Sequence, residues 1–245
     1  MRLTRVHVDL PLAPGMEVSL PEAPAVHLAR VLRLGVGDAC VLFNGDGRDY
    51  PARVVASGKR ELRVAITGAM AVDSESPLRI ILLQGIARGE KMDLILQKAT
   101  ELGVSEIRPL GSQRSEVKLD ETRAAKRLSH WQSVVVSACE QSGRAVVPAV
   151  WAPAALATAL AALPAGGLRL ILDPFGALSL STLEPPGGQS ILLAVGPEGG
   201  WSPRDRDELV AAGFDGMRLG PRVLRTETAG LAAIAALQAR FGDLA

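Results

Sequence analysis

The sequence predicts an α/β protein in two parts, a small β-rich domain followed by a larger domain built on a mostly parallel sheet. Residues 1–72 carry short strand-like runs that are separated by turn signals. From residue 78 onward, apolar runs alternate with helical patterns, which is the order expected of a parallel sheet. The polar stretch 73–77 ends in proline and separates the two patterns, so we divide the chain into domains 1–72 and 73–245.

The composition, 48% hydrophobic and 22% charged, is typical of a globular protein with a buried core. The net charge of +1 means that an RNA partner would be met by local basic patches. No apolar run reaches the roughly 18 residues of a membrane span, and the first residues lack the apolar stretch of a signal peptide. We therefore expect a cytoplasmic protein without a membrane partner. The two cysteines and three histidines lack metal-ligand spacing, so no metal is expected.

The first part reads as a small β-barrel with one helix. The strand-like run 41–43 leads into Asn-Gly-Asp-Gly at 44–47, a strong hairpin signal. Residues 61–66 alternate apolar and polar side chains, as a half-buried strand does. Residues 25–34 have a helical apolar pattern. Small barrels of this kind often present RNA.

The second part reads as alternating strands and helices. The continuous apolar run 80–83 is typical of a strand buried on both faces. Residues 91–102 form an amphipathic pattern that Gly103 ends. From the residues alone, this order predicts an unknotted, doubly wound sheet with helices on both faces. The other expected strands are 107–110, 168–172 and 191–195, and the other helices are 128–139 and a plain surface helix at 154–165.

Ligands of parallel sheets bind beyond the carboxyl ends of the strands, and a glycine-rich loop follows one such end. The strand at 191–195 runs directly into Gly-Pro-Glu-Gly-Gly at 196–200. A helix follows, for which Ser202 is a good N-cap, Pro203 suits the first position and Asp205 can complete a capping box. Three glycines exceed what a tight turn needs, so we interpret this segment as a ligand loop.

Two more strand ends are candidate ligand sites. A short strand ends at Gly220-Pro221, and we expect Thr226 to cap an apolar helix over 227–241 that packs deeply or pairs with a second subunit. Arg222 and Arg225 flank this bend. The sequence leaves open whether each arginine forms a structural salt bridge or has a functional role. A third strand ends at Leu172-Asp173-Pro174, which by itself is a weak signal.

Several enzyme classes are disfavoured by what the sequence lacks. No G-x-G-x-x-G follows the first strand of the second part, and there is no Walker loop. The sequence therefore disfavours dinucleotide-dependent enzymes and P-loop NTPases. Three histidines, two of them in the small domain, do not suggest a Ser-His-Asp arrangement.

The chain resembles the ribosomal RNA small subunit methyltransferase E family over nearly its whole length. Its glycine loop and the segment Leu-Gly-Pro-Arg-Val-Leu-Arg-Thr-Glu-Thr-Ala at 219–229 are similar to the family's C-terminal signature. Further similar segments occur in the expected order, at 27–34, 43–47, 91–103, 112–115 and 140–144.

The resemblance implies a fold and a function. It implies an N-terminal PUA-like β-barrel and a C-terminal SPOUT α/β domain with a deep trefoil knot, which the residues alone would not predict. It implies S-adenosylmethionine as methyl donor and a homodimer formed through the SPOUT domain. The implied reaction is methylation at N3 of one uridine in the decoding region of 16S rRNA, within the small ribosomal subunit.

The resemblance also suggests roles for individual residues. We expect Arg225, or Arg114, to hold the uracil oxygens, and Glu198 to act as base or, preferably, to orient its loop. Asp173 stands where the family pattern has another residue, so its role is open. Expected RNA contacts are Arg30, Arg33, Lys91 and Arg114. Expected cofactor contacts are Leu172, Asp173, Gly196, Pro197, Glu198, Gly199, Gly200, Leu219, Gly220, Val223, Leu224, Arg225 and Thr228.

Two other interpretations stay open at this point. One is a non-catalytic RNA-binding or ribosome-assembly factor that keeps only the fold, which the intact glycine loop and Arg225 disfavour. The other is a SPOUT enzyme that acts on tRNA or on a ribose hydroxyl. The N-terminal barrel favours the ribosomal target over this second alternative.

Overall fold

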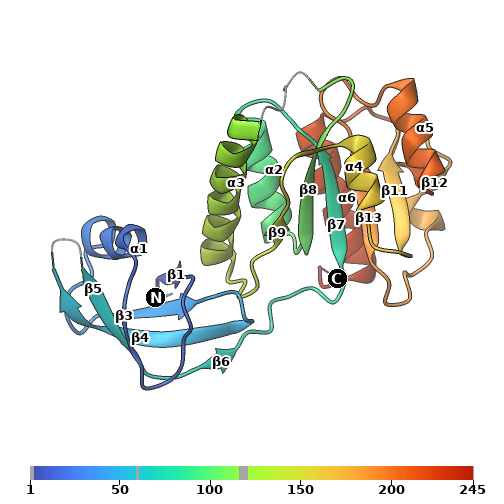
Figure 1. Ribbon diagram of the computed structural model, residues 1–245. Helices are drawn as coiled ribbons and strands as arrows, with labels where there is room; N and C mark the ends of the chain where they lie inside the picture. The colour runs from blue at the N-terminus through green and yellow to red at the C-terminus, as the bar shows by residue number, and fades with distance from the viewer. Residues whose placement is uncertain (1–2, 59–60, 116–120, 245) are drawn as a thin grey trace. The chain divides into compact units, whose positions relative to one another are not determined.

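The computed structural model describes residues 3–58, 61–115 and 121–244 (Figure 1). The chain divides into two compact units. The first unit is Met1–Glu75 with Val136–Val147, and the second is Ser76–Val135 with Pro148–Ala245. Each unit has its own core and is described by itself below.

The first unit is a six-stranded, mostly antiparallel sheet with the order β1-β3-β4-β5-β2 and β6 paired to β4. The predicted hairpin is confirmed, since β3 and β4 pair antiparallel on either side of the turn at 44–47. Gly45 and Gly47 have φ of 91° and 85°, a conformation that glycine adopts readily. The strands are β1 (Arg5–His7), β2 (Glu17–Ser19), β3 (Ala39–Phe43), β4 (Arg48–Ser57), β5 (Leu62–Ile66) and β6 (Met70–Ala71).

The helix predicted over 25–34 differs in the structure. It begins earlier as α1 (Glu22–Val26) and continues as a π-helical turn, η1 (His27–Val31). Leu28 is fully buried in the core of the sheet, and the wider turn accompanies this burial. Arg33 has φ of 57°, so the helix cannot continue through it.

Buried arginines connect the first 75 residues to the segment Val136–Val147. The guanidinium of Arg5 lies 2.6 Å from Asp49 and also donates to the main-chain oxygens of Cys139 and Arg144, at 2.8 and 3.1 Å. Arg144 in turn lies 2.6 Å from Glu75. These charge-assisted bonds explain why the segment belongs to this unit although it is distant in sequence.

The second unit contains the predicted parallel sheet. Its order is β10-β8-β7-β13-β11-β14-β12, with β9 paired to β8, and every pairing recorded in it is parallel. The strands are β7 (Ile80–Gly85), β8 (Glu106–Gly111), β9 (Ala149–Val150), β10 (Ala154–Ala155), β11 (Leu168–Leu172), β12 (Leu178–Ser179), β13 (Ile191–Val195) and β14 (Asp215–Arg218).

Helices cover both faces of this sheet (Figure 1). On one face, Leu156 and Leu209 of α4 and α5 pack on Ile81 and Ala194 in one core cluster. On the other face, α6 packs on α2 and β13, with Gly230 beside Val195. The helices are α2 (Glu90–Glu101), α3 (Glu121–Ser142), α4 (Leu156–Ala161), the 3-10 turn η2 (Leu180–Thr182), α5 (Pro203–Ala211) and α6 (Thr226–Phe241), and the residues of α3 from Val136 onward belong to the first unit.

Two expectations for this unit were wrong in extent. The alanine-rich segment 154–165 contains only the six-residue α4, preceded by β10, and its Leu156 and Ala159 are buried. The helix expected at 128–139 is the middle of the longer α3. None of the described helices is long and apolar enough to span a membrane. The trefoil knot stays a prediction, because strand order alone does not define how the chain threads.

Candidate functional site

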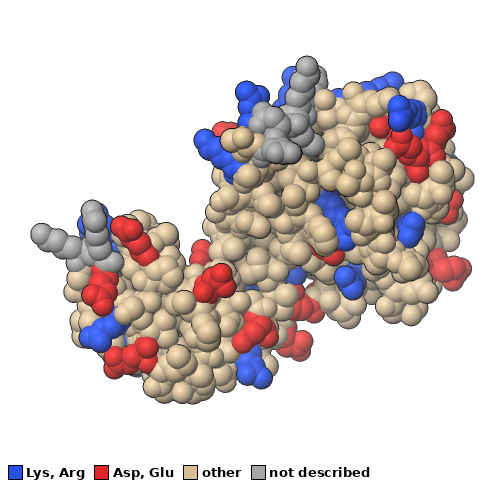
Figure 2. Space-filling model, in the orientation of Figure 1, with Lys and Arg blue, Asp and Glu red and all other residues tan. Residues whose placement is uncertain are grey.

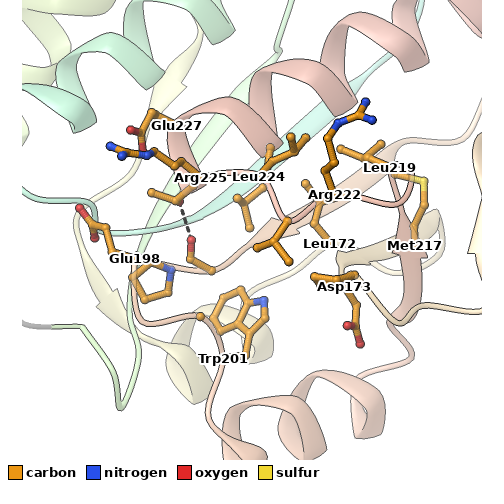
Figure 3. A pocket seen from close by; sticks show the side chains of 18 of the residues that line it. Leu172, Asp173, Glu198, Trp201, Met217, Leu219, Arg222, Leu224, Arg225 and Glu227 are labelled. Carbon is orange, nitrogen blue, oxygen red and sulfur yellow. Dashed lines mark hydrogen bonds between the residues drawn. The ribbon is translucent and has the colours of Figure 1, made fainter.

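A cavity of about 370 Å³ lies where β11, β13 and β14 end (Figure 3). The three strands are parallel neighbours, so their carboxyl ends meet at one edge of the sheet. The three segments that the sequence indicated separately therefore form one site. The cavity is lined by Lys91, Leu172, Asp173, Pro174, Val195, Gly196, Pro197, Glu198, Gly200, Trp201, Arg206, Met217, Leu219, Gly220, Arg222, Val223, Leu224, Arg225, Thr226, Glu227 and Ala229.

One wall is the glycine loop, Gly196–Trp201. The helix after it begins as predicted: the Ser202 hydroxyl accepts from the Asp205 amide at 3.0 Å, and the Asp205 carboxylate accepts from the Ser202 amide at 2.9 Å. This capping box, with Pro203 in the first turn, sets the direction in which the chain leaves the loop.

The start of α6 holds the glycine loop from the other side. Thr226 is inside the helix rather than at its N-cap, which is Arg225, so the predicted capping role of Thr226 was wrong. Its buried hydroxyl instead donates to the Gly196 carbonyl at 2.5 Å and accepts from Gln84 Nε2 at 3.1 Å. A hydroxyl that can donate and accept thus connects three segments that are distant in sequence.

Close packing also positions the loop. A Cβ at Gly85, the last residue of β7, would lie 2.5 Å from the Pro197 nitrogen, so this position needs glycine. A Cβ at Gly199 would lie 3.0 Å from the Arg114 Cβ. Arg114 itself donates to the Gly199 carbonyl at 3.1 Å, which places it on the outer side of the loop.

Charged side chains gather at one end of the cavity. The Lys91 ammonium lies 3.6 Å from a carboxylate oxygen of both Glu198 and Glu227. Partial burial raises the pKa of Glu198, but the main-chain amide of Arg88 and the Lys91 ammonium outweigh it and hold the pKa below its ordinary value. Glu198 is therefore ionised at neutral pH, and its contacts bind the loop to the start of α2.

A second ion pair lies at the opposite end. Both terminal guanidinium nitrogens of Arg206, on α5, donate hydrogen bonds to the Asp173 carboxylate, and Nη2 lies 3.1 Å from Oδ1. The hydrogen bond from Arg206 is the main reason that the pKa of Asp173 is lowered, and the Phe175 amide adds to it against the effect of burial. Asp173 is thus a fixed anion beneath the end of β11.

The structure brings most of the predicted site residues together. Of the expected cofactor contacts, eleven line the cavity and two, Gly199 and Thr228, do not. Arg225 and Glu198 line it, Lys91 lies at its charged end, and Arg114 lies behind the glycine loop. What these residues do stays a prediction, since the geometry records their positions only.

Several lining residues were not predicted. Trp201 directly follows the predicted glycine loop, 196–200, and Glu227 lies within the segment 219–229, so both were close to the predicted contacts although neither was among them. Arg206 and Met217 carry no local signal, because α5 and β14 reach the cavity only through the strand order.

The remaining predicted RNA contacts lie in the first unit. Arg30 belongs to η1 and Arg33 follows it, and both are exposed. On the face shown in Figure 2, basic and acidic side chains are interspersed. Within the described part of the chain, no cluster of three or more histidine, cysteine or acidic residues could hold a metal ion.

Comparison with protein families agrees with this architecture. Residues 74–238 match the family model of an RNA methyltransferase domain, and residues 25–67 match that of an RNA methyltransferase PUA domain. The fold and these matches define an RNA methyltransferase with a PUA domain, which confirms the predicted fold class apart from the knot.

Individual relatives identify the family. A ribosomal RNA small subunit methyltransferase E from Buchnera aphidicola is 31% identical, with 99% of this chain and 98% of that protein aligned. The crystal structure of such an enzyme from Neisseria gonorrhoeae, bound to S-adenosylmethionine, is 41% identical over the full length of both chains, with a TM-score of 0.93. A methyltransferase from Legionella pneumophila in complex with S-adenosylmethionine is 36% identical over both full lengths, with a TM-score of 0.95. The chain belongs to the ribosomal RNA small subunit methyltransferase E family.

Proposed function

We propose that this protein uses S-adenosylmethionine to methylate N3 of one uridine in the decoding region of 16S rRNA. The observation that carries the proposal is the cavity at three strand ends, in which an anchored glycine loop faces a loop that carries Arg222 and Arg225. Two similar proteins of the same length bind S-adenosylmethionine, which supports this choice of methyl donor.

The lining of the cavity fits this methyl donor. Leu172, Met217 and Leu219 provide apolar surface for a nucleoside base, and Gly196 and Gly200 let the main chain approach closely. The carboxylates of Glu198 and Glu227 suit a ligand that carries a sulfonium and an ammonium group. When bound, S-adenosylmethionine supplies a methyl group activated by a positively charged sulfur.

For the reaction, the uracil gives its N3 proton to solvent water, and the chain has to stabilise the anion that remains. We assign this role to Arg225, which lines the cavity, because a guanidinium stays charged and donates several hydrogen bonds to the uracil oxygens. Arg114 is assigned to support the glycine loop and to contact RNA, since one of its nitrogens already donates to Gly199. Glu198 orients the loop through Arg88 and Lys91.

The target nucleotide is extruded from its stack to reach a cavity of this kind. We propose that Arg30, Arg33, Lys91 and Arg114 contact RNA phosphates, which position a substrate without reading its sequence. Residues 1–72 would form the RNA-binding PUA-like barrel, and residues 73–245 the SPOUT methyltransferase domain with its knot. The apolar character of α6 supports a homodimer formed through this second domain, and a ribosomal substrate supports a cytoplasmic location.

Two measurements test the proposed function. Mass spectrometry of 16S rRNA from cells with and without the gene should show one 3-methyluridine that is lost with the protein. Arg225→Ala should lower kcat about 100-fold or more with the affinity for S-adenosylmethionine within a few-fold, as for loss of a donor that acts in the transition state. Arg204→Ala, an exposed arginine of α5, is the control. Wild-type turnover in Arg225→Ala would remove this residue from the mechanism. An equal 3-methyluridine content in 16S rRNA from cells with and without the gene would refute the proposed reaction.

A further inference from the structure

The indole N–H of Trp201 is a buried donor in the wall of the cavity. Only 6% of the residue is exposed, and its Nε1 meets no hydrogen-bond acceptor within the described ranges of the chain. Buried indole N–H groups usually have a partner, and leaving one unsatisfied destabilises a protein. Such an exception is expected where a ligand supplies the acceptor.

The surroundings of Trp201 direct its nitrogen toward the ligand space. The ring packs in the core cluster that contains Ile171, Ala194 and Leu209, which fixes its orientation. The ring atom Cε2, which is bonded to Nε1, would lie 3.4 Å from a Cβ at Gly196. The side of the ring that carries Nε1 therefore lies next to Gly196, in the part of the cavity wall that Trp201 forms.

We propose that the Trp201 Nε1–H donates a hydrogen bond to the nucleoside part of the bound methyl donor. This inference rests on the proposed function and deepens it by assigning a recognition residue. A nucleoside offers acceptors of the right kind, the unprotonated ring nitrogens of adenine and the oxygens of ribose. Trp201 would thus select for the nucleoside of the ligand rather than for its amino-acid part.

The distribution of charge in the cavity supports this orientation of the ligand. Figure 3 shows Glu198, Arg225 and Glu227 toward one end, and Leu172 and Met217 toward the other, where Asp173 and Arg222 also lie. The charged end suits the ammonium and carboxylate of the donor's amino-acid part, which pair with opposite charges. At the other end, the apolar side chains of Leu172 and Met217, which are paired residues of β11 and β14, suit the adenine.

Trp201→Phe removes the donor and keeps an aromatic ring. Isothermal titration should show about 3- to 10-fold weaker binding of both S-adenosylmethionine and 5′-methylthioadenosine, which lacks the amino-acid part, as expected for one hydrogen bond. The melting temperature without ligand should fall no further than in Trp131→Phe, which loses the same ring volume at a buried site, because the lost N–H of Trp201 has no protein partner in the described structure. Trp131→Phe, at a buried tryptophan of α3, is the matched control and should bind both ligands as wild type does.

A spectroscopic measurement on the unaltered chain is independent of how the variant folds. The chain has three tryptophans, so nitrogen-15 labelling of the indoles gives three N–H signals. The Trp201 signal is the one that is missing in Trp201→Phe, or the one that remains after the other two have been assigned. The Trp201 signal should move downfield when 5′-methylthioadenosine is added. An unmoved signal with unchanged affinities overturns this inference and leaves the proposed function standing. Weaker binding of S-adenosylmethionine alone overturns the assignment to the nucleoside, and a wild-type chain that binds neither ligand overturns the proposed function as well.

Discussion

The two loops that form the cavity are built in opposite ways. In the glycine loop, Pro197 and Trp201 are buried, and the carbonyls of Gly196 and Gly199 accept hydrogen bonds from side chains of other elements. In the arginine loop, which we define as Leu219–Arg225, residues 220–223 are exposed, and Val223 is 79% exposed. Both loops contribute to one cavity.

This difference separates two tasks within one site. Pro197 and Trp201 fix the glycine loop to the protein core, although Glu198 and Gly199 are exposed, so its geometry is established by the same packing that stabilises the fold. The arginine loop contributes little to the core, so its side chains remain available to ligands. Changes in the first loop should therefore cost stability and binding together, whereas changes in the second should affect binding alone.

The largest effect is expected at Gly85, beneath the glycine loop. Gly85→Ala places a methyl group 2.5 Å from the Pro197 nitrogen, so the loop has to move. We expect S-adenosylmethionine binding to weaken at least about 10-fold and the free energy of unfolding to fall by about 1–3 kcal/mol. Titration calorimetry measures the binding of S-adenosylmethionine, and urea unfolding measures the free energy of unfolding. Gly68→Ala, where a Cβ meets no atom within 4 Å, is the control, and equal behaviour of the two variants would contradict a packed loop.

The next effect concerns the hydrogen bonds of Thr226. Thr226→Val keeps the shape but leaves the Gly196 carbonyl and one Gln84 donor without this partner. We expect a loss of about 1–3 kcal/mol in the free energy of unfolding, the range for an unsatisfied buried polar group. The free energy of unfolding is measured in urea for Thr226→Val and for the control Thr158→Val, which changes an exposed threonine of α4. Equal stability of the two variants would show that Thr226 does not anchor the loop.

A pH-dependent effect is expected at Asp173. Because its pKa is lowered in the folded protein, its contribution to stability is present above the ordinary value of 3.8 and is lost as pH falls through the lower, folded value. Asp173→Asn should therefore be less stable than wild type at neutral pH, by about 1 kcal/mol or less since Arg206 is partly exposed. Unfolding followed from neutral to acidic pH should show this gap narrowing below about pH 4. A stability difference between wild type and Asp173→Asn that stays constant with pH would exclude the ion pair as its source.

The smallest effect on stability is expected at Val223 in the arginine loop. Val223→Ser should change the free energy of unfolding by less than about 0.5 kcal/mol, as for other exposed positions. Binding of S-adenosylmethionine should nevertheless weaken about 2- to 5-fold, because apolar surface that lines the cavity is lost. Val210→Ser, at an exposed valine of α5 outside the cavity lining, should change neither quantity. A large loss of stability in Val223→Ser would remove the contrast between the loops.

Sequence patterns predicted the parts of the site that depend on neighbouring residues. The capping box of Ser202 and Asp205 spans three positions, and the strand before it is a run of apolar residues, so both are visible locally. Each of the three strand ends was predicted as a candidate ligand site because ligands of parallel sheets bind beyond the carboxyl ends of the strands, and the strand order of the structure joined the three. Thr226 was misjudged because a threonine near a helix start is usually a cap, whereas here its hydroxyl turns to Gly196, 30 positions away.

The order of apolar runs, glycines and caps by itself determined a β-rich first part, a parallel sheet in the second part and a glycine loop after residue 195. Only the tertiary structure decided that Gly85 lies against Pro197, that Arg206 holds Asp173 and that Trp201 lines the cavity. The reason is physical: local patterns report the preferences of adjacent residues. Contacts between distant residues arise only when the strand order and the packing of helices bring them within a few ångströms of one another.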